Sequence, residues 1–559
     1  MESQPIPTTE LAQLDTNKIA ATNLSDDKQA AQSNHMLMLG VAVIFLYQVF
    51  LLILAGWQNR HALTPDGVSY IRIASYYLHG QFDLAVSGYW GPMLSWLIAP
   101  WLALVENPLY AARITMGFSA IVFLIGCVSI FRSLEIHPAG LVLGAWVAAV
   151  SSAAWSVETI AADLLMSGLM CLAISRMITS HWLESRSLQI AAGVFWGMAY
   201  LAKAVAFPLA FIISGAIALL WLIGRWSDRK VIGRSLTITL SAFLSVACVW
   251  VLMLSLKYER VVFSTNGTIN YANAGPTNTT RRHPSFVIFH QPEAGRVTSW
   301  EDPTDMPYQS WSPFDSLENF KHQLILISWN AELAFKHLSE FATPQFGLFA
   351  MILGLLVHTP WRENMKTQRW RWAGVIVACI VGIYLPVYGE EQRHYYATFP
   401  LLFAASIGMM TWLTREYRGI VAWHRLIGFT IVAICFAVPG YTALKRASIQ
   451  TAEKKEVSYA RELANKLQSA NVHGSIVGGR EAGLFTALVA ERAWYGDKMN
   501  PTIDELKNSG ADLVILPRYE TEIEQSNQGQ TFVNIDSLLF NGEENTKKFP
   551  LKVYHITHP

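Results

Sequence analysis

Residues 61–101 read HALTPDGVSYIRIASYYLHGQFDLAVSGYWGPMLSWLIAPW and follow a first long apolar segment, 36–57. The turn Thr64-Pro65-Asp66-Gly67 has the composition of a helix start. Apolar side chains then recur at helical intervals until Gly80, with polar ones between them, which predicts a short amphipathic helix at a membrane surface. A second apolar piece, 91–105, is rich in Trp and contains two prolines. An acid beside an apolar segment, followed by two juxtamembrane helices, is an arrangement suited to chemistry at the bilayer surface.

The composition is that of a membrane protein. Of the 559 residues, 52% are apolar, 20 are Trp and only 15% are charged, well below the roughly 25% that is usual for soluble domains. The net charge of +1 argues against a nucleic-acid-binding protein. All five cysteines lie inside apolar runs without a metal-ligand spacing, so we expect small buried hydrophobic residues rather than disulfides or metal ligands.

Long apolar segments predict eleven transmembrane helices, because a helix needs about 20 mostly apolar residues to cross the bilayer. The predicted spans are 36–57, 109–130, 138–155, 159–178, 188–200, 204–223, 236–256, 343–358, 372–388, 395–414 and 426–444. We therefore expect an all-α polytopic membrane domain over 36–445, with additional juxtamembrane helices. A polar, disordered cytoplasmic tail (1–35) precedes it and a small soluble domain (446–559) follows it.

The loop charges orient the chain in the plasma membrane, since Lys and Arg are enriched in cytoplasmic loops. If 91–105 does not cross the membrane, the basic clusters share the cytoplasmic side: Arg132, Arg176, Arg186, Arg225, Arg229, Lys230, Arg234, Arg362, Lys366, Arg369, Arg371, Arg415, Arg418 and Arg425. We therefore expect 91–105 to lie in the interface or to dip into it. The N-terminus is then cytoplasmic, and the loops 61–105 and 257–342 face outward together with the C-terminal domain.

The loop 257–342 contains Trp300, Tyr308 and Trp311 and ends in a predicted helix, 316–341, capped by Asp315 and Glu318. The apolar face of this helix is Leu317, Phe320, Leu324, Ile327 and Ala331. The aromatic residues of the loop could stack on a sugar or anchor the loop in the membrane interface. Anchoring is favoured, because Trp and Tyr commonly occupy that depth.

The C-terminal residues predict an α/β domain, with strands at 475–477, 493–495 and 511–516 and helices near 481–491 and 502–509. Gly478-Gly479 and Gly483 follow the first strand but do not complete a dinucleotide-binding motif. Tight packing or docking of an acceptor is the favoured interpretation of these glycines.

Several ionisable residues share the predicted outer face. Asp66 is a candidate helix cap and a candidate base that accepts the proton of an acceptor hydroxyl, and the two roles are not exclusive. Glu158 and Asp163 open the fourth span, and a carboxylate in the membrane costs about 2.5–3.5 kcal/mol, so it should face a polar cavity. Because the two are five residues apart on a helix, they do not point the same way, and Asp163 is the stronger candidate for the site.

Two cations stand out on the same face. Lys203 lies between two apolar spans, where it either extends toward the interface or binds a phosphate. Arg393, in Gly389-Glu390-Glu391-Gln392-Arg393-His394-Tyr395-Tyr396, offers a planar fork to a phosphate, and Tyr395 or Tyr396 offers a hydroxyl. The alternative is the solvated, aromatic end of a span.

In order, these motifs resemble the GT-C class of integral-membrane glycosyltransferases, over roughly residues 36–415. The nearest likeness is to bacterial relatives of the protein O-mannosyltransferases and to the lipid A aminoarabinose transferases. The motifs are Asp66-Gly67-x-x-Tyr70, Gly80-Gln81-Phe82, Pro92-Met93-x-x-Trp96, Asp163-Leu164-Leu165, Lys203 before Pro208, and Arg393-His394-Tyr395 before Pro400.

The resemblance implies a hexosyl or pentosyl transferase that moves a sugar from a polyprenyl-phosphate carrier to a lipid, glycan or protein acceptor at the outer face. Asp66 would be the base in an inverting displacement. Lys203, Arg393 and Tyr395 would hold the lipid phosphate, and Asp163, Glu158 and His394 would contact the acceptor or a metal. The resemblance requires no cofactor, and a divalent metal ion stays an open alternative.

The sequence also departs from the family. Gly67 stands where an acid is expected, and Tyr89-Trp90-Gly91-Pro92 replaces the Glu-Lys-Pro-Pro element of the aminoarabinose transferases. The alternative function is a membrane transporter or flippase of a lipid-linked or small anionic substrate. A transporter would carry ionisable groups near the midplane and symmetric broken helices, whereas these groups share one surface.

Overall fold

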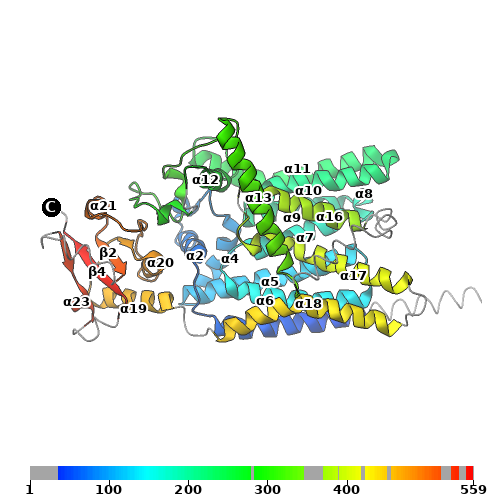
Figure 1. Cartoon of the computed structure of the whole chain (residues 1–559), viewed down its shortest axis with the longest axis horizontal. Helices are drawn as coiled ribbons and strands as arrows, with labels where there is room; N and C mark the ends of the chain where they lie inside the picture. Colours follow the sequence, from blue (N-terminus) through cyan, green and yellow to red (C-terminus); the bar gives the residue numbers. More distant parts are fainter. Residues whose placement is uncertain are drawn as a thin grey trace, which may run out of the picture.

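The computed structural model describes residues 35–278, 282–344, 369–387, 389–416, 422–449, 455–517, 531–540 and 549–557. The predicted tail, apart from residue 35, and nearly all of the predicted span 343–358 lie outside these residues. Figure 1 shows a large helical part with a small α/β domain at one end. The predicted fold class is confirmed: an all-α membrane domain followed by a small α/β domain.

Six helices of the described residues are long and apolar enough to cross a membrane. They are His35–Gln58, α5 (Pro108–Ser133), α6 (Pro138–Glu158), α10 (Ala206–Gly224), α11 (Arg229–Lys257, after the 3-10 turn Trp226–Asp228) and α18 (Ala422–Ile449). Four other predicted spans correspond to shorter helices, α7 (Asp163–Met177), α9 (Arg186–Ala202), α16 (Arg369–Tyr384) and α17 (Phe399–Glu416). The short helix α8 (His181–Glu184) connects α7 to α9.

The decisive segment 61–101 forms three helices, α2 (Pro65–Leu78), α3 (Phe82–Ala85) and α4 (Pro92–Leu102). The 11 residues of α4 extend about 16 Å, roughly half of the apolar core of a bilayer, so α4 does not cross it. Helix α2 also forms as predicted, but it does not lie open at a surface. Its polar side is covered, because the Ser69 hydroxyl donates to the Trp300 carbonyl and Arg72 bonds the C-terminal domain.

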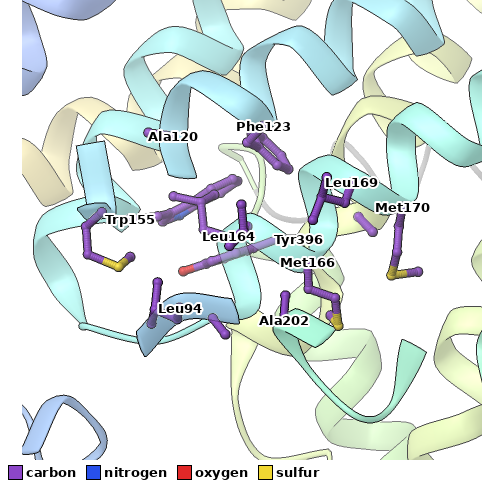
Figure 2. Packing of buried hydrophobic residues seen from close by; sticks show 14 of the residues in the cluster. Leu94, Ala120, Phe123, Trp155, Leu164, Met166, Leu169, Met170, Ala202 and Tyr396 are labelled. Atoms are coloured by element: carbon purple, nitrogen blue, oxygen red, sulfur yellow. The ribbon is translucent and has the colours of Figure 1, made fainter. Parts of the chain in front are cut away.

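The core of the membrane domain depends on close helix contacts. A Cβ atom at Gly168 of α7 would lie 2.7 Å from the backbone nitrogen of Phe123 in α5, so only glycine permits this approach. Figure 2 shows the aromatic centre of this core, where Trp155 of α6 stacks on Tyr396 with ring centroids 4.0 Å apart. Phe123 meets Trp155 edge to face. Two cysteines, Cys127 and Cys171, are buried here as predicted, whereas Cys248 is exposed, because a thiol also suits an apolar outward helix face.

Helix α13 (Leu317–Ser339) forms where predicted, but the apolar face that was expected to be buried points outward. Leu317, Phe320 and Leu324 of the predicted apolar face are exposed. The buried face contains Leu326 and Ala334 together with polar residues, and the side-chain amides of Gln323 and Asn330 donate to the carbonyls of Pro386 and Leu385. In a membrane domain, apolar side chains suit the lipid, and polar ones find their partners inside. The predicted cap was also wrong, since Ser316 caps the helix and Asp315 accepts from the Ser312 backbone.

The loop between α11 and α13 contains α12 (Asn266–Asn273) and two 3-10 turns, Pro284–Phe286 and Pro303–Asp305. The aromatic residues singled out from the sequence contact other protein groups, contrary to the favoured anchoring interpretation, whereas Phe314 is exposed. Trp300 is buried, and its indole NH donates to the Pro65 carbonyl. Trp311 stacks on Tyr271, with ring centroids 4.7 Å apart. The loop is therefore fastened to the start of α2.

The C-terminal domain is a four-stranded sheet with helices. Its strands are β1 (Ile476–Gly478), β2 (Leu513–Pro517), β3 (Phe532–Asn534) and β4 (Leu551–Ile556), in the order β1-β2-β4-β3. Only β1 and β2 are parallel. The helices are α19 (Lys455–Ser469), α20 (Arg480–Val489), α21 (Ile503–Lys507) and α23 (Asp536–Phe540).

Two of the three predicted strands are confirmed, and 493–495 makes only a single bridge through Trp494. The glycines between β1 and α20 serve packing. A Cβ atom at Gly483 would lie 2.0 Å from the Gly478 carbonyl oxygen, and Gly478 and Gly479 have positive φ angles.

Candidate active site

Asp66 lies in the first turn of α2, where the helix dipole favours a negative charge. Asp66 is not the cap, because Thr64 occupies that position and Pro65 begins the helix. The Asp66 carboxylate instead accepts from Arg393, with 2.6 Å between Oδ2 and Nη1. The capping interpretation of Asp66 was therefore wrong. Its carboxylate points to Arg393, which the sequence analysis proposed as a phosphate-binding residue.

Asp163 and Lys203 form a second pair. Asp163 lies in the first turn of α7 with its side chain only 3% exposed, and its Oδ1 is 2.5 Å from Lys203 Nζ. Lys203 occupies the extended break between α9 and α10, which turns its side chain out of the helical register. The partner of Lys203 in the structure is therefore the Asp163 carboxylate, whereas the sequence analysis considered a phosphate or the membrane interface.

Arg393 joins the two pairs. It lies in the 3-10 helix η4 (Gln392–Thr398), with its Nε 3.9 Å from Asp163 Oδ2 and also paired with Glu391. Burial lowers the pKa of Arg393, but the carboxylates of Asp66, Asp163 and Glu391 outweigh burial and hold this pKa well above its usual value. The cluster of Asp66, Asp163, Glu391, Lys203 and Arg393 has three acids and two bases, a formal charge of −1.

A cavity of about 360 Å³ opens beside this charged cluster. It is lined by five of the seven residues singled out from the sequence: Asp66, Asp163, Lys203, Arg393 and His394. Burial, and next to it the charge of Lys203, holds the pKa of His394 well below its usual value, so the imidazole is neutral. The His394 ring stacks on Tyr384, with centroids 4.8 Å apart. The cavity therefore combines fixed charges with neutral groups.

Tyr395 and Glu158 do not line this cavity. Tyr395 is fully buried, and its ring packs against His337 and Tyr384. Glu158 is the last residue of α6 and is exposed. The geometry thus separates these two side chains from the five residues that meet.

Other lining residues were missed by the sequence reasoning. Tyr384 borders the cavity, and among the described residues its buried hydroxyl has no hydrogen-bond partner. Asn266, Asn270 and Asn273 line the cavity from one face of α12. Their spacing of four and three residues was the available signal, because such positions share one side of a helix.

A divalent metal ion needs several oxygen, nitrogen or sulfur ligands grouped together. Among the described residues, no three His, Cys, Asp or Glu side chains are grouped closely enough to hold one. The oxygens of Asp163 already face Lys203 and Arg393, whose charges oppose a cation. The side chains in the described part of the chain therefore do not fit a metal site.

A strip of the cavity beside Lys203 is apolar. It comprises Ala204, Val205, Pro208, Phe263, Leu326, Trp329, Ile383 and Val387. Phe263 and Trp329 are each more than one-third exposed at the protein surface. The cavity therefore extends from buried ion pairs to an apolar, accessible edge.

The fold is similar to those of solved membrane transferases. ArnT from Cupriavidus metallidurans bound to undecaprenyl phosphate superposes with a TM-score of 0.53 at 12% identity, covering 92% of this chain and 97% of that one. The Archaeoglobus fulgidus oligosaccharyltransferase in its apo form superposes with a TM-score of 0.52 at 12% identity, covering 86% of this chain and 69% of that one.

The archaeal enzyme AglB, in complex with an inhibitory peptide and a dolichol-phosphate, gives a TM-score of 0.51 at 10% identity, covering 87% of this chain and 70% of that one. No protein-family model matches the sequence, and no curated protein matches it either. The likeness lies in the fold, and it extends over most of the chain and into the C-terminal domain. The chain is a multi-pass membrane protein with the fold of the GT-C glycosyltransferases.

Proposed function

We propose that the chain transfers a sugar from a polyprenyl-phosphate carrier to an acceptor hydroxyl at the outer face of the membrane, with inversion at the anomeric carbon. One observation carries the proposal: Asp66, Lys203 and Arg393 line one cavity, which continues into an apolar strip. The solved relatives with bound undecaprenyl phosphate and dolichol-phosphate support a lipid-phosphate ligand for this fold.

The charges of the site suit a single displacement. The acceptor oxygen forms a bond to the anomeric carbon while the bond from that carbon to the phosphate oxygen breaks. Asp66 accepts the proton of the acceptor hydroxyl. The electron pair of the broken bond leaves on the polyprenyl phosphate, and the charges of Arg393 and Lys203 stabilise it. The apolar strip accommodates the polyprenyl chain.

The ion pairs also determine how a phosphate enters. Arg393 and Lys203 are already paired with carboxylates, so an incoming phosphate must take over part of their hydrogen bonds. Release of Asp66 from Arg393 leaves its carboxylate available as a base. Donor binding and activation of Asp66 are therefore one event in this proposal.

The reaction is tested with purified protein in lipid nanodiscs, polyprenyl-phosphate sugars as donors and an alkyl glycoside as the acceptor. We expect release of polyprenyl phosphate, reduced about 10²–10⁴-fold by Asp66→Asn, as for loss of a general base. The matched control is Asp83→Asn, an exposed acid in α3, which should retain wild-type turnover. In sealed proteoliposomes, intact donor that crosses the bilayer without bond cleavage would instead support a transporter.

The sidedness is tested separately in intact cells. A single cysteine at Glu293, an exposed position of the loop before α13, is introduced into a cysteine-free variant. We expect labelling by a membrane-impermeant maleimide. Labelling only after the cells are lysed would contradict the outer-face assignment.

A further inference from the structure

The cavity has a second wall whose side chains carry no charge. This neutral wall consists of Tyr89, Trp90, Asn266, Asn270, His283 and Trp300. Tyr89 and Trp90 lie in the connection between α3 and α4, Asn266 and Asn270 lie in α12, and the other two residues lie in the loop between α12 and α13. The proposed reaction assigns no role to these residues.

The amides of the neutral wall are held in place by one another. The Asn270 side-chain amide donates to Asn266 Oδ1 at 3.0 Å, and the Tyr89 hydroxyl donates to Asn270 Oδ1 at 3.4 Å. A side-chain amide has two donors and an oxygen with two lone pairs, so these bonds use only part of its capacity. The wall therefore presents fixed donors and acceptors to the cavity.

His283 supplies one donor of defined direction. Its Nδ1 accepts from the Ser285 backbone NH at 3.2 Å, which leaves the ring proton on Nε2 in the neutral tautomer. Burial lowers the pKa of His283 to about 3, so this neutral form prevails at physiological pH. Nε2 is buried, and no residue of the described part of the chain accepts its proton.

Aromatic rings hold the imidazole from two sides. The His283 ring lies edge to face with Trp300, with centroids 4.6 Å apart, and with Tyr89, with centroids 5.5 Å apart. A buried donor without an acceptor costs about 1–3 kcal/mol, so this arrangement is best explained by a ligand oxygen.

We propose that the neutral wall recognises an uncharged sugar ring, with His283 Nε2 donating to a sugar oxygen and the amides of Asn266 and Asn270 bonding its hydroxyl groups. The inference rests on the proposed function and adds the class of sugar. A cationic amino sugar is bound best by a carboxylate at the sugar itself, and the neutral wall carries none, since its polar groups are hydroxyl, amide, imidazole and indole groups. The ring is that of the donor sugar or of a sugar acceptor, since the chemistry of both is the same.

The first arm of the test compares two donors on the wild-type protein, a polyprenyl-phosphate hexose and a polyprenyl-phosphate 4-amino-pentose. We expect kcat/KM to favour the neutral hexose. In Asn270→Asp, which adds a carboxylate to the wall, the preference should shift toward the amino sugar. A wild-type preference for the amino sugar would overturn the inference.

The second arm uses two matched replacements of His283. In His283→Asn, the side-chain oxygen still accepts from the Ser285 NH, but the donor at Nε2 is lost. In His283→Gln, an amide NH reaches the position of Nε2. We expect kcat/KM to fall about 5- to 100-fold in His283→Asn, as for loss of one buried hydrogen bond, and to recover in His283→Gln. The melting temperature of both variants controls for misfolding.

The kinetic constants identify which sugar occupies the wall. A rise in the donor KM assigns it to the transferred sugar, and a rise in the KM of the alkyl glycoside assigns it to the acceptor. Wild-type constants for both substrates in His283→Asn would overturn the inference while Asp66-dependent transfer continued. If no donor released its carrier phosphate, the proposed function itself would fail, and this inference with it.

Discussion

The charged cluster and the neutral wall face the same cavity but are built in opposite ways. In the charged cluster, the side chains satisfy one another, as in the 2.5 Å contact between Asp163 and Lys203. In the neutral wall, His283 holds a buried donor that no described residue satisfies. On ligand binding, the charged cluster must therefore exchange hydrogen-bond partners, whereas His283 in the neutral wall only gains one. We expect variants of the charged cluster to damage folding and turnover together, and variants of the neutral wall to change mainly selectivity.

The largest effect is expected at Arg393. In Arg393→Gln, Asp66 loses its partner, and the proposed lipid phosphate loses a planar donor. Turnover should fall about 10²–10³-fold or more, as for the loss of one preorganised donor at developing charge. Release of polyprenyl phosphate measures it, and Arg296→Gln, at an exposed residue, is the control. Retained turnover would separate Arg393 from the leaving group.

The next effect concerns stability at Lys203. In Lys203→Met, the buried carboxylate of Asp163 loses its closest cation, which should reduce the free energy of unfolding by about 3–5 kcal/mol. The double variant Asp163→Asn/Lys203→Met should recover much of the thermal stability but not the turnover. Lys336→Met, at an exposed position of α13, is the control. Recovery of both properties would assign the pair a purely structural role.

A smaller effect is expected at Arg72, which touches neither region of the cavity. Its guanidinium bonds the buried Glu301 at 3.1 Å and the Ala487 carbonyl at 2.8 Å, and it also reaches the Arg492 carbonyl. In Arg72→Met, α2 should be less firmly fastened, and kcat should fall about tenfold with little change in donor KM, the size expected for about 1.4 kcal/mol of lost positioning. Limited proteolysis should cleave between the two domains faster. Unchanged proteolysis and kcat would contradict this role.

The effect that is smallest at neutral pH, and grows only as the pH falls, is the pH dependence of stability at His283. Because burial lowers its pKa from the usual 6.5 to about 3, the unfolded chain binds a proton there that the folded chain does not. This part of the stability is therefore lost as the pH falls from about 6.5 toward 3. The melting temperature of His283→Asn should decline less steeply over this range than that of the wild type. Parallel declines would show that His283 is protonated in the folded protein.

Much of the fold follows from local patterns in the sequence. The apolar lengths and the basic loops predicted helices at each span that the structure describes, and the short, proline-containing segment 91–105 was predicted not to cross. The orientation of α13 was wrong, because apolar periodicity identifies a face but not whether lipid or protein covers it. The strands β3 and β4 were not predicted. They are stabilised by pairing, of β4 with β2 and of β3 with β4, and such contacts between distant segments leave no local pattern in the sequence.

The charged residues of the site were predictable from the sequence, because a charge beside apolar membrane helices is energetically costly. Asp163, Lys203 and Arg393 are conspicuous beside apolar helices, and the structure brings them together with Asp66. The neutral wall was not predictable in the same way. In the sequence, Asn270 and His283 look like ordinary residues of a polar loop. In the structure, the hydrogen bonds between Trp300 and α2 hold this loop beside the cavity, so both residues line it.

The contacts of Arg72 also impose an order on the synthesis of the protein. The carboxylate of Asp66 and the guanidinium of Arg72 leave the ribosome early, but the carbonyls that hold Arg72 belong to Ala487 and Arg492. Because a chain is made from its N-terminus, α2 cannot be secured until almost all of the protein has been translated. A chain that ended before Ala487 would thus insert its helices into the bilayer with α2 still unfastened.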